Sequence, residues 1–324
     1  MRILFLYGQD ASFVRADLTM LRRMGDVTPL QCGSGVTVAT VARALLGHDA
    51  AFVWFGLGHA SRAVLAGRLL GKRVYLVGGG WDVAVIPEIG YGAARTTYGR
   101  TRAAWTFGLA TRVLAFSDWS RREILAVAPR ARVETVYLGV DTDAWRPAAK
   151  KETIILTVGQ VVETNLQRKG LMTFAEVSRY IPSARFVLVG KQDAKAAGYL
   201  RQVGGPNLEM PGELSEGALH DLAGKASVYV QVSYTEGFGL ALAEAMSAEC
   251  VPVVTQKGAI PEVVGPTGIY VSYGDPVATA EAIKEALRSD LGARARARIE
   301  AEFPLQLREE ALKRVVATKN CLRG

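Results

Sequence analysis

The chain has 324 residues, 49% of them apolar and 22% charged, and a formal net charge of +8. This length predicts two domains of ordinary size, and the composition is that of a globular protein. Three scattered cysteines, with no CxxC pair or Cys/His cluster, support neither a disulfide framework nor a zinc site and favour a reducing, cytoplasmic setting.

The chain begins directly with a strand-like segment, MRILFLY. Its apolar run is too short for a signal peptide, and no small-residue cleavage site follows. Nowhere in the sequence is an apolar run long enough to span a bilayer. We therefore expect any contact with a membrane to be peripheral.

The positive charge is concentrated in the first half. Residues 1–148 hold 18 Lys/Arg and 11 Asp/Glu, a balance of +7, which leaves +1 for the remainder. Such a bias suggests an anionic partner for this half: a lipid surface, a lipid phosphate or a nucleic acid. Solubility alone is the alternative explanation.

The first half alternates short apolar runs with amphipathic segments, which predicts a parallel sheet covered by helices on both faces. Ligands in such sheets bind beyond the carboxyl ends of the strands. The expected strands are 3–6, 51–54, 74–77, 113–116 and 133–136, and the expected helices lie near 11–24, 35–46, 59–70, 95–109 and 118–127.

The second half repeats this architecture. Strands are expected at 153–158, 186–189, 208–210 and 228–232, and the last helices near 277–289 and 305–320. Ser117 and Ser215 each stand immediately before an expected helix, where a serine hydroxyl caps free N–H groups.

The stretch from Tyr234 to Val254, YTEGFGLALAEAMSAECVPVV, organises the second half. It reads as a glycine-containing loop, a helix from about Leu240, and a buried strand. Helix-start N–H groups form a ready anion site, and glycines allow a close backbone approach to a ligand. Glu236 before the helix and Glu244 within it can reach two hydroxyl-bearing parts of one ligand, a layout that matches a nucleotide-sugar.

This stretch resembles the retaining glycosyltransferases of family 4, whose fold is called GT-B. Glu236 and Glu244 match the two glutamates of the family's signature. The surrounding matches are Gly237, Phe238, Gly239, Ala245, Met246 and Pro252. The resemblance implies two Rossmann-like, doubly wound α/β domains facing across a cleft. Residues 1–148 would bind the acceptor and 149–304 the nucleotide-sugar, and a final helix in 305–324 would cross back to the first domain.

The resemblance also implies roles for individual residues. Glu236 would bind sugar hydroxyls and favour a cationic transition state, and Glu244 would hold the ribose hydroxyls. Lys169, with N–H groups from Phe238 to Leu240, would stabilise the departing diphosphate. The further donor-binding positions are Gly8, Gly159, Gln160, Arg168, Lys191, Gly237, Gly239 and Leu214.

Three positions depart from the family's pattern. Gln160 stands where the family has an arginine that clamps the diphosphate, and Arg168 could substitute for it. Trp81-Asp82 stands where the family often has a His or His-Asp pair, so Asp82 would meet a donor-sugar or acceptor hydroxyl, or else cap a helix. Glu249 occupies a turn position that the family usually gives to glycine. His59 is a second candidate for the missing histidine, with a structural role as its alternative.

A basic, aromatic stretch from Tyr91 to Phe107 suits a membrane interface or an anionic acceptor, although a solvated helix face would look the same. The resemblance implies an enzyme that moves a sugar from a UDP-, GDP- or ADP-sugar to a lipid-linked or glycan acceptor with retention of configuration. No cofactor, bound metal or nucleic acid is expected. Two alternatives are a GT-B sugar-nucleotide epimerase and a non-catalytic subunit that keeps the fold.

Overall fold

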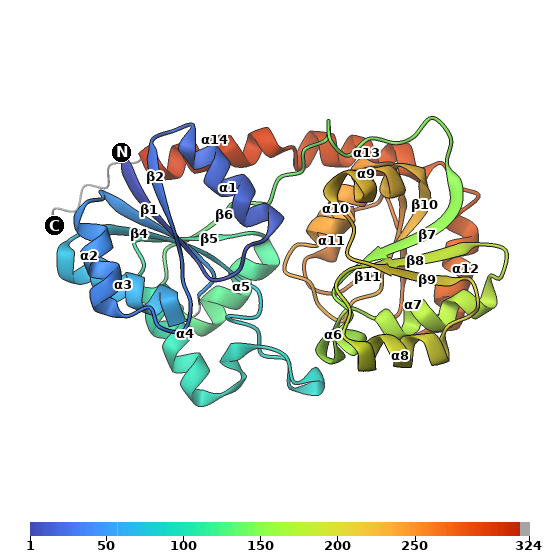
Figure 1. Cartoon of the computed structure of the whole chain (residues 1–324), viewed down its shortest axis with the longest axis horizontal. Helices are drawn as coiled ribbons and strands as arrows, with labels where there is room; N and C mark the ends of the chain where they lie inside the picture. Colours follow the sequence, from blue (N-terminus) through green and yellow to red (C-terminus); the bar gives the residue numbers. More distant parts are fainter. Residues whose placement is uncertain (57, 318–324) are drawn as a thin grey trace. The chain divides into compact units, whose positions relative to one another are not determined.

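The computed structural model describes residues 1–56 and 58–317, so the end of the expected segment 305–324 lies outside the described residues. The chain divides into two compact units. One contains Met1–Leu138 together with the chain from Gln306 onward, and the other contains Gly139–Leu305. The division after Leu138 comes earlier in the chain than the expected boundary at 148. Each unit is a sheet with helices on both faces (Figure 1).

The first unit is built on a six-stranded parallel sheet in the order β2-β1-β3-β4-β5-β6. The order reverses between β1 and β3, and a crevice for ligands is expected at such a switch point. The strands are β1 (Arg2–Tyr7), β2 (Asp26–Gln31), β3 (Ala50–Trp54), β4 (Arg73–Gly78), β5 (Arg112–Ala115) and β6 (Val133–Thr135).

Helices cover both faces of this sheet. The first and last helices of the unit lie on one face, and the other four pack their apolar residues into a common core on the opposite face (Figure 1). The helices are α1 (Ser12–Arg22), α2 (Val38–Leu46), α3 (Gly58–Leu70), α4 (Thr97–Leu109), α5 (Asp118–Val127) and α14 (Leu305–Ala317), with 3₁₀ turns at Pro87–Ile89 and Ala93–Arg95.

The second unit also has a six-stranded parallel sheet, in the order β12-β11-β10-β7-β8-β9. Read from its other edge, this is the strand order of a doubly wound fold. Its switch point lies between β7 and β10. The strands are β7 (Glu152–Val158), β8 (Arg185–Val189), β9 (Leu208–Gly212), β10 (Ala226–Gln231), β11 (Val251–Thr255) and β12 (Ile269–Val271).

Helices α7, α8 and α12 pack together on one face of this second sheet, and α10 and α13 pack together on the other (Figure 1). The full set is α6 (Glu163–Arg168), α7 (Leu171–Val177), α8 (Ala194–Val203), α9 (Glu216–Lys225), α10 (Leu240–Ser247), α11 (Ile260–Val264), α12 (Pro276–Ala286) and α13 (Leu291–Glu302), with a 3₁₀ turn at Ser178–Tyr180.

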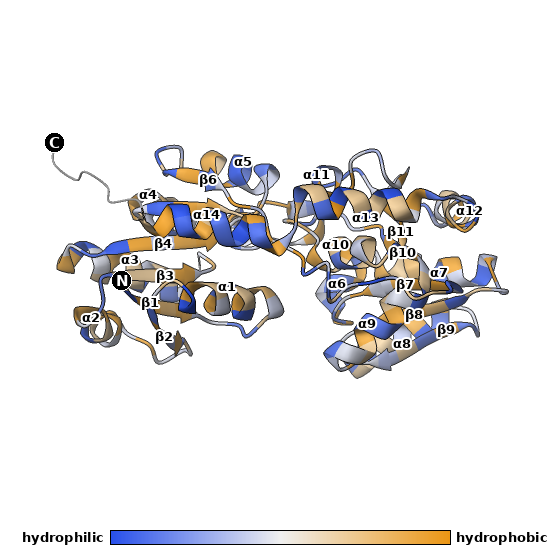
Figure 2. Ribbon diagram, turned by 90° about the horizontal axis from the view of Figure 1, so that it is seen from above, coloured by the Kyte–Doolittle hydropathy of each residue, from blue (hydrophilic) through white to orange (hydrophobic). Residues whose placement is uncertain are grey.

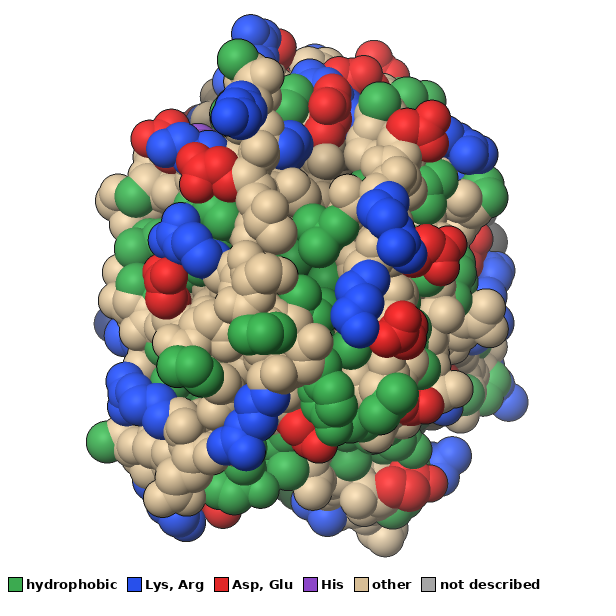
Figure 3. Space-filling view, turned by 90° about the vertical axis from the view of Figure 1, so that its right-hand side faces the viewer, with side chains coloured by type: hydrophobic (Ala, Val, Ile, Leu, Met, Phe, Trp, Pro, Cys, Tyr) green, Lys and Arg blue, Asp and Glu red, His purple; other side chains and the backbone are tan. Residues whose placement is uncertain are grey.

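The central strands are apolar over most of their length because both of their faces are covered. Every residue of β3 and of β11 is buried, and the strands are largely orange in Figure 2. Parallel sheets have this character because crossover helices lie on both sides. The surface shown in Figure 3 instead has basic and acidic side chains interspersed among apolar ones.

The predicted fold class is confirmed, and most elements lie where the sequence places them. Ser117 caps α5 by accepting from the Ser120 N–H, and Ser215 caps α9 by accepting from the Ala218 N–H. Glu249 has a positive φ of 62°, in the region that favours glycine. Several elements were missed, among them strand β2, which has one buried residue and contains Pro29, and the helices α8 and α13, of which α13 alternates alanine with charged residues along much of its length.

One predicted surface residue is in fact part of the core. Phe107 was grouped with the exposed basic, aromatic stretch, but its side chain is fully buried. A Cβ added to Gly56 or to Gly78 would lie 2.5 or 2.9 Å from its ring. These strand-end glycines therefore make room for Phe107, which the alternation of aromatic and basic residues did not reveal.

A buried ion pair holds the last helix to the first unit. Arg308 on α14 donates to both carboxylate oxygens of Asp17 on α1, over 2.6 and 2.7 Å. The same guanidinium donates to the carbonyls of Val136 and Tyr137 and lies 5.6 Å from the centre of the Trp54 ring. Arg308 is 3% exposed and Asp17 is fully buried, so every charge here is satisfied by protein.

Removing one member of this pair should be costly. Arg308→Leu leaves the Asp17 carboxylate buried without a cation, and we expect a loss of about 3–5 kcal/mol in the free energy of unfolding, measured by urea denaturation. The double variant Asp17→Leu/Arg308→Leu removes both charges and should recover at least half of that loss. An Arg308→Leu protein as stable as the parent would contradict this account.

Candidate functional site

Glu236 lies in the loop that follows β10, at the switch point of the second sheet. Its backbone is fixed by the loop after β11, since the Ala259 N–H donates to the Glu236 carbonyl over 2.9 Å. Gly258 has a φ of +61°, and a Cβ there would come within 2.4 Å of the same carbonyl oxygen. Only glycine allows this approach without displacing Glu236.

One oxygen of the Glu236 carboxylate is surrounded by donors. Oε1 accepts from Lys169 Nζ at 2.9 Å and from Ser233 Oγ at 3.2 Å, and Arg168 Nη1 lies 3.7 Å away. The described residues supply no hydrogen-bond partner for Oε2. Two cations therefore face this carboxylate, and one of its oxygens remains available to a ligand.

The two cations are brought to Glu236 by the turn between α6 and α7. Gly170 adopts φ +65°, and a Cβ there would lie 2.1 Å from the Val232 carbonyl, so this turn presses against the end of β10. Arg168 is oriented by Asn165, whose Oδ1 accepts from Nη2 and Nε over 2.8 and 3.1 Å. The structure thus joins Lys169, Arg168 and Glu236, which the sequence had named separately.

The charges set the protonation of Glu236. Burial raises the pKa of its carboxyl, but the positive charges of Lys169 and Arg168, with hydrogen bonds from Lys169 and Ser233, outweigh burial and hold the pKa below its ordinary value. The group is therefore ionised at neutral pH. An ionised carboxylate accepts hydrogen bonds and does not donate them.

Glu244 is placed differently. It sits one turn into α10, and the described residues give its carboxyl no hydrogen-bond partner. Although part of the side chain reaches solvent, the carboxyl is set deeply enough that burial, with a smaller contribution from the negative charge of Glu216, raises its pKa to about 8. Glu244 is therefore mostly protonated at pH 7 without a ligand.

The loops after β7 and β8 are held together at the same edge of the sheet. The Gly159 N–H donates to Val189, and Val161 donates to the Lys191 carbonyl over 2.8 Å. A Cβ on Gly159 would lie 2.9 Å from the side chain of Lys169. Gly159 therefore borders the Glu236 cluster, while the exposed Gln160 and Lys191 flank it and Leu214 follows β9.

The start of α10 completes this edge. Gly239 precedes the helix with φ +92°, and Leu240 is its first residue. The Phe238 side chain is buried against Phe303, so only its backbone can meet a ligand. Beneath the loop, Gln231 Nε2 and Thr235 Oγ1 are buried without a partner in the described part of the chain. Buried polar groups without a partner are uncommon in proteins, which makes this loop a candidate for a functional role.

In the first unit, Asp82 accepts three backbone hydrogen bonds. Its oxygens receive the N–H groups of Gly56, Gly79 and Gly80 over 2.8 to 3.1 Å, and it is 2% exposed. Burial raises the pKa of this carboxyl, and the N–H donors oppose that shift. This geometry positions the Gly79-Gly80 loop, and direct contact of Asp82 with a substrate remains a prediction.

Gly8 and His59 meet at the switch point of the first sheet. A Cβ on Gly8 would lie 3.3 Å from the imidazole ring of His59, whose Nε2 lies 2.8 Å from the Trp54 carbonyl. His59 is 7% exposed, and burial lowers its pKa. A neutral, buried ring bonded to the backbone fits the structural role that was kept as its alternative.

The sequence reasoning missed two polar residues that hold the cluster. Ser233 contacts Glu236, and Asn165 contacts Arg168. Gly258, which fits beneath Glu236, belongs to a G-x-x-P-E-V turn that the family resemblance places under the donor site. The polar side chains had no such signal, because each contacts a residue three positions away only in the conformation that its loop or helix adopts in the folded chain.

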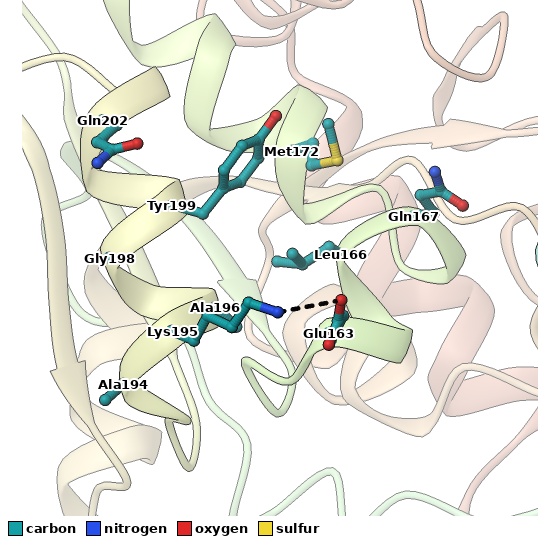
Figure 4. A pocket seen from close by; sticks show the side chains of 10 residues that line it. All are labelled: Glu163, Leu166, Gln167, Met172, Ala194, Lys195, Ala196, Gly198, Tyr199 and Gln202. Atoms are coloured by element: carbon teal, nitrogen blue, oxygen red, sulfur yellow. Dashed lines mark ion pairs between the residues drawn. The ribbon is translucent and has the colours of Figure 1, made fainter.

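A large hollow elsewhere on the second unit does not coincide with the Glu236 cluster. A hollow of about 700 Å³ lies on the second unit between α6, α7 and α8, where Tyr199 points toward Met172 and an ion pair between Lys195 and Glu163 bridges the two sides (Figure 4). It contains none of the predicted site residues. Its floor is apolar, and we assign it no ligand.

Neither a metal cluster nor a membrane-spanning helix occurs in the described residues. Among residues 1–56 and 58–317, no group of three His, Cys, Asp or Glu side chains could hold a metal ion. Over the same residues, no helix has both the length and the apolar character needed to cross a membrane.

The chain is similar to known proteins in family, in sequence and in structure. Residues 152–289 match the model of the family "Glycosyl transferases group 1". A subunit of the phosphatidylinositol N-acetylglucosaminyltransferase of Arabidopsis thaliana is 28% identical over 169 residues, which are 48% of this chain and 37% of that protein. The alpha-maltose-1-phosphate synthase of Mycolicibacterium smegmatis is 25% identical over 295 residues, covering 83% of this chain and 70% of that protein.

Solved structures share the whole fold. The sucrose-phosphate synthase of Thermosynechococcus elongatus superposes with a TM-score of 0.81 at 16% identity, covering 98% of both chains. Anabaena Alr3699/HepE in complex with UDP and glucose superposes with a TM-score of 0.80 at 14% identity, covering 98% of this chain and 99% of that one. The architecture is therefore GT-B, and residues 152–289 of the second unit are similar to the glycosyl transferases group 1 family.

Proposed function

We propose that this protein transfers a sugar from a nucleotide-diphosphate sugar to an acceptor, with retention of anomeric configuration. The observation that carries the proposal is the Glu236 cluster at the switch point between β7 and β10. A carboxylate with one oxygen that has no partner among the described residues lies beside two cations there. The free oxygen suits a sugar hydroxyl, and the positive charge suits a diphosphate.

The mechanism follows from where charge develops. The departing diphosphate gains negative charge in the transition state, so Lys169, Arg168 and the N–H groups at the start of α10 act more strongly there than on the bound substrate. The ionised Glu236 faces the sugar, where positive charge develops as the bond to the leaving group breaks. No residue of the cluster needs to act as a base, because the leaving phosphate can accept the acceptor's proton.

Two lines of support concern the substrates. The HepE structures hold UDP, UDP-glucose, or UDP with glucose, which favours a UDP-sugar among the UDP-, GDP- and ADP-sugars considered. The sequence relatives are named for maltose 1-phosphate and for phosphatidylinositol. For the acceptor we retain a lipid-linked or glycan molecule. The proposed working place is the cytoplasm, at or near a membrane surface.

A membrane or anionic acceptor would meet the first unit near α4. Tyr98 and Trp105 are 74% and 40% exposed on this helix, and Trp81 is 48% exposed in a loop joined to it through the Ala93 N–H, which donates to the Trp81 carbonyl. Arg95 and Arg100 are exposed in the same segment. Aromatic and cationic side chains together are typical of an interfacial surface.

The first test removes charge from the diphosphate site. Lys169→Ala should lower turnover by about two to three powers of ten, the loss typical of one electrostatic donor in a water-excluded site. Gln160→Arg should raise turnover if one missing charge limits the reaction. Both are measured as nucleotide release from a nucleotide-sugar with its acceptor. Full activity in Lys169→Ala would remove the diphosphate from this site. A silent Gln160→Arg would mean that Arg168 or another cation already fills this role.

The second test uses the raised pKa of Glu244. If ribose hydroxyls donate to the ionised carboxylate, donor binding favours the deprotonated form, so affinity should rise about tenfold from pH 7 to pH 9 and level off above pH 8. Binding at pH 7 should then release a proton, which calorimetry in buffers of different ionisation enthalpy detects.

Variants of Glu244 provide the controls. Glu244→Ala should weaken donor binding by about 1.5–3 kcal/mol, the range for hydrogen bonds to a charged group. Glu244→Gln keeps the shape of the side chain but should abolish the pH dependence. Donor affinity that is unchanged in Glu244→Ala would place the ribose elsewhere.

The third test concerns the surface near α4. Replacing Arg95, Arg100 and Arg102 with Ser should reduce binding to anionic liposomes, most strongly at low salt, because screening weakens exposed charges. Liposomes of neutral lipid serve as the control. If the parent protein ignores anionic liposomes and the triple variant keeps its activity, these arginines form only a solvated face.

A further inference from the structure

A second hollow lies at the carboxyl ends of β10, β11 and β12 in the second unit. Its volume is about 630 Å³, and its walls come from the segments that follow these three strands. The Glu236 cluster occupies the gap between β7 and β10, so this hollow is on the opposite side of β10. Carboxyl ends of parallel strands are where doubly wound sheets bind ligands.

The described lining of the hollow contains a cation and no acidic side chain. Lys257 is the charged residue of its described lining, and its Nζ lies 5.4 Å from the centre of the Tyr234 ring. Within the described part of the chain, Lys257 has no carboxylate partner. Tyr234 Oη, the Gln256 amide and Ser272 Oγ likewise have no hydrogen-bond partner there. One cation surrounded by neutral donors, with no acid, is suited to a compact anion with several oxygens.

Two tyrosines of the lining are held in place without a ligand. Tyr273 Oη donates to the Gln167 carbonyl over 2.9 Å, and its ring meets that of Tyr234 edge to face, with the ring centres 5.0 Å apart. The Tyr234 N–H in turn donates to the Arg168 carbonyl over 2.8 Å. Groups held in place before binding lose little freedom when a ligand arrives, which favours affinity.

The same contacts connect this hollow to the Glu236 cluster. Gln167 and Arg168, which hold the two tyrosines, immediately precede Lys169. Gly258 follows Lys257 and fits against the backbone of Glu236. A ligand that moves Tyr234 or Lys257 therefore bears on the residues that face the sugar and the diphosphate.

We propose that this hollow, which we call the Lys257 pocket, is a second anion site that takes the phosphate of a phosphate monoester. Lys257 supplies the charge, and Tyr234, Gln256 and Ser272 donate hydrogen bonds to the phosphate oxygens. The ligand is either free inorganic phosphate or a phosphorylated sugar, two sources of the same chemistry. The site is separate from the diphosphate site of Lys169, so its existence does not depend on the proposed transfer reaction.

The test is a calorimetric titration of the full chain with inorganic phosphate, with glucose 1-phosphate and with glucose. Both phosphates should bind saturably and glucose should not. Lys257→Gln should weaken phosphate binding by about tenfold to a hundredfold, as expected for loss of one charged hydrogen bond. Tyr234→Phe, which removes only a hydroxyl, should weaken it severalfold. Lys225→Gln, at an exposed lysine of α9, is the matched control and should bind normally.

A second comparison separates this site from the diphosphate site. Lys169→Ala should retain phosphate binding even where nucleotide-sugar binding is lost. Tighter binding of glucose 1-phosphate than of phosphate identifies a sugar phosphate as the ligand, and equal binding identifies free phosphate. The proposal is overturned if neither phosphate binds saturably, if Lys257→Gln binds as the parent does, or if Lys169→Ala alone abolishes binding.

Discussion

The site in the second unit depends on the need to compensate one buried carboxylate. An ionised glutamate with 11% of its side chain exposed is stable only if positive charge and hydrogen-bond donors lie close to it. For Glu236 these come from the α6–α7 turn, which follows a different strand. The carboxylate thus ties the loop after β10 to the segment after β7. These are the two strands that flank the switch point, so electrostatics and topology select the same place.

Glycine makes this meeting of loops possible. Gly170 lets the α6–α7 turn approach the end of β10, and Gly258 lets the loop after β11 approach Glu236 from the other side. Both have positive φ, and at both a side chain would enter the space of a carbonyl oxygen. A substitution at either position would move the backbone that carries the charges. The precision of the cluster therefore depends on residues that have no side chains of their own.

Much of the fold was predictable because its signals are local. Buried parallel strands are continuous apolar runs, and Ser117 and Ser215 mark helix starts through their own hydroxyls. The Glu236 loop was predictable from its glycines and the helix that follows. What could not be predicted depends on the folded arrangement of the chain. Arg308 meets Asp17 across nearly the whole chain, and Ser233 meets Glu236, three residues later, only in the conformation of the folded loop.

Asp82 and Glu236 are buried carboxylates at the carboxyl ends of the two sheets, and the protein satisfies them in opposite ways. Asp82 receives three backbone N–H groups and, among the described residues, no cation, and its pKa is raised. Glu236 faces two cations, its pKa is lowered, and its Oε2 has no partner among the described residues. A carboxylate whose oxygens are already bonded to its own loop fixes that loop in place. One that keeps its charge and a free oxygen can bind a ligand, which is why the chemistry proposed here centres on Glu236.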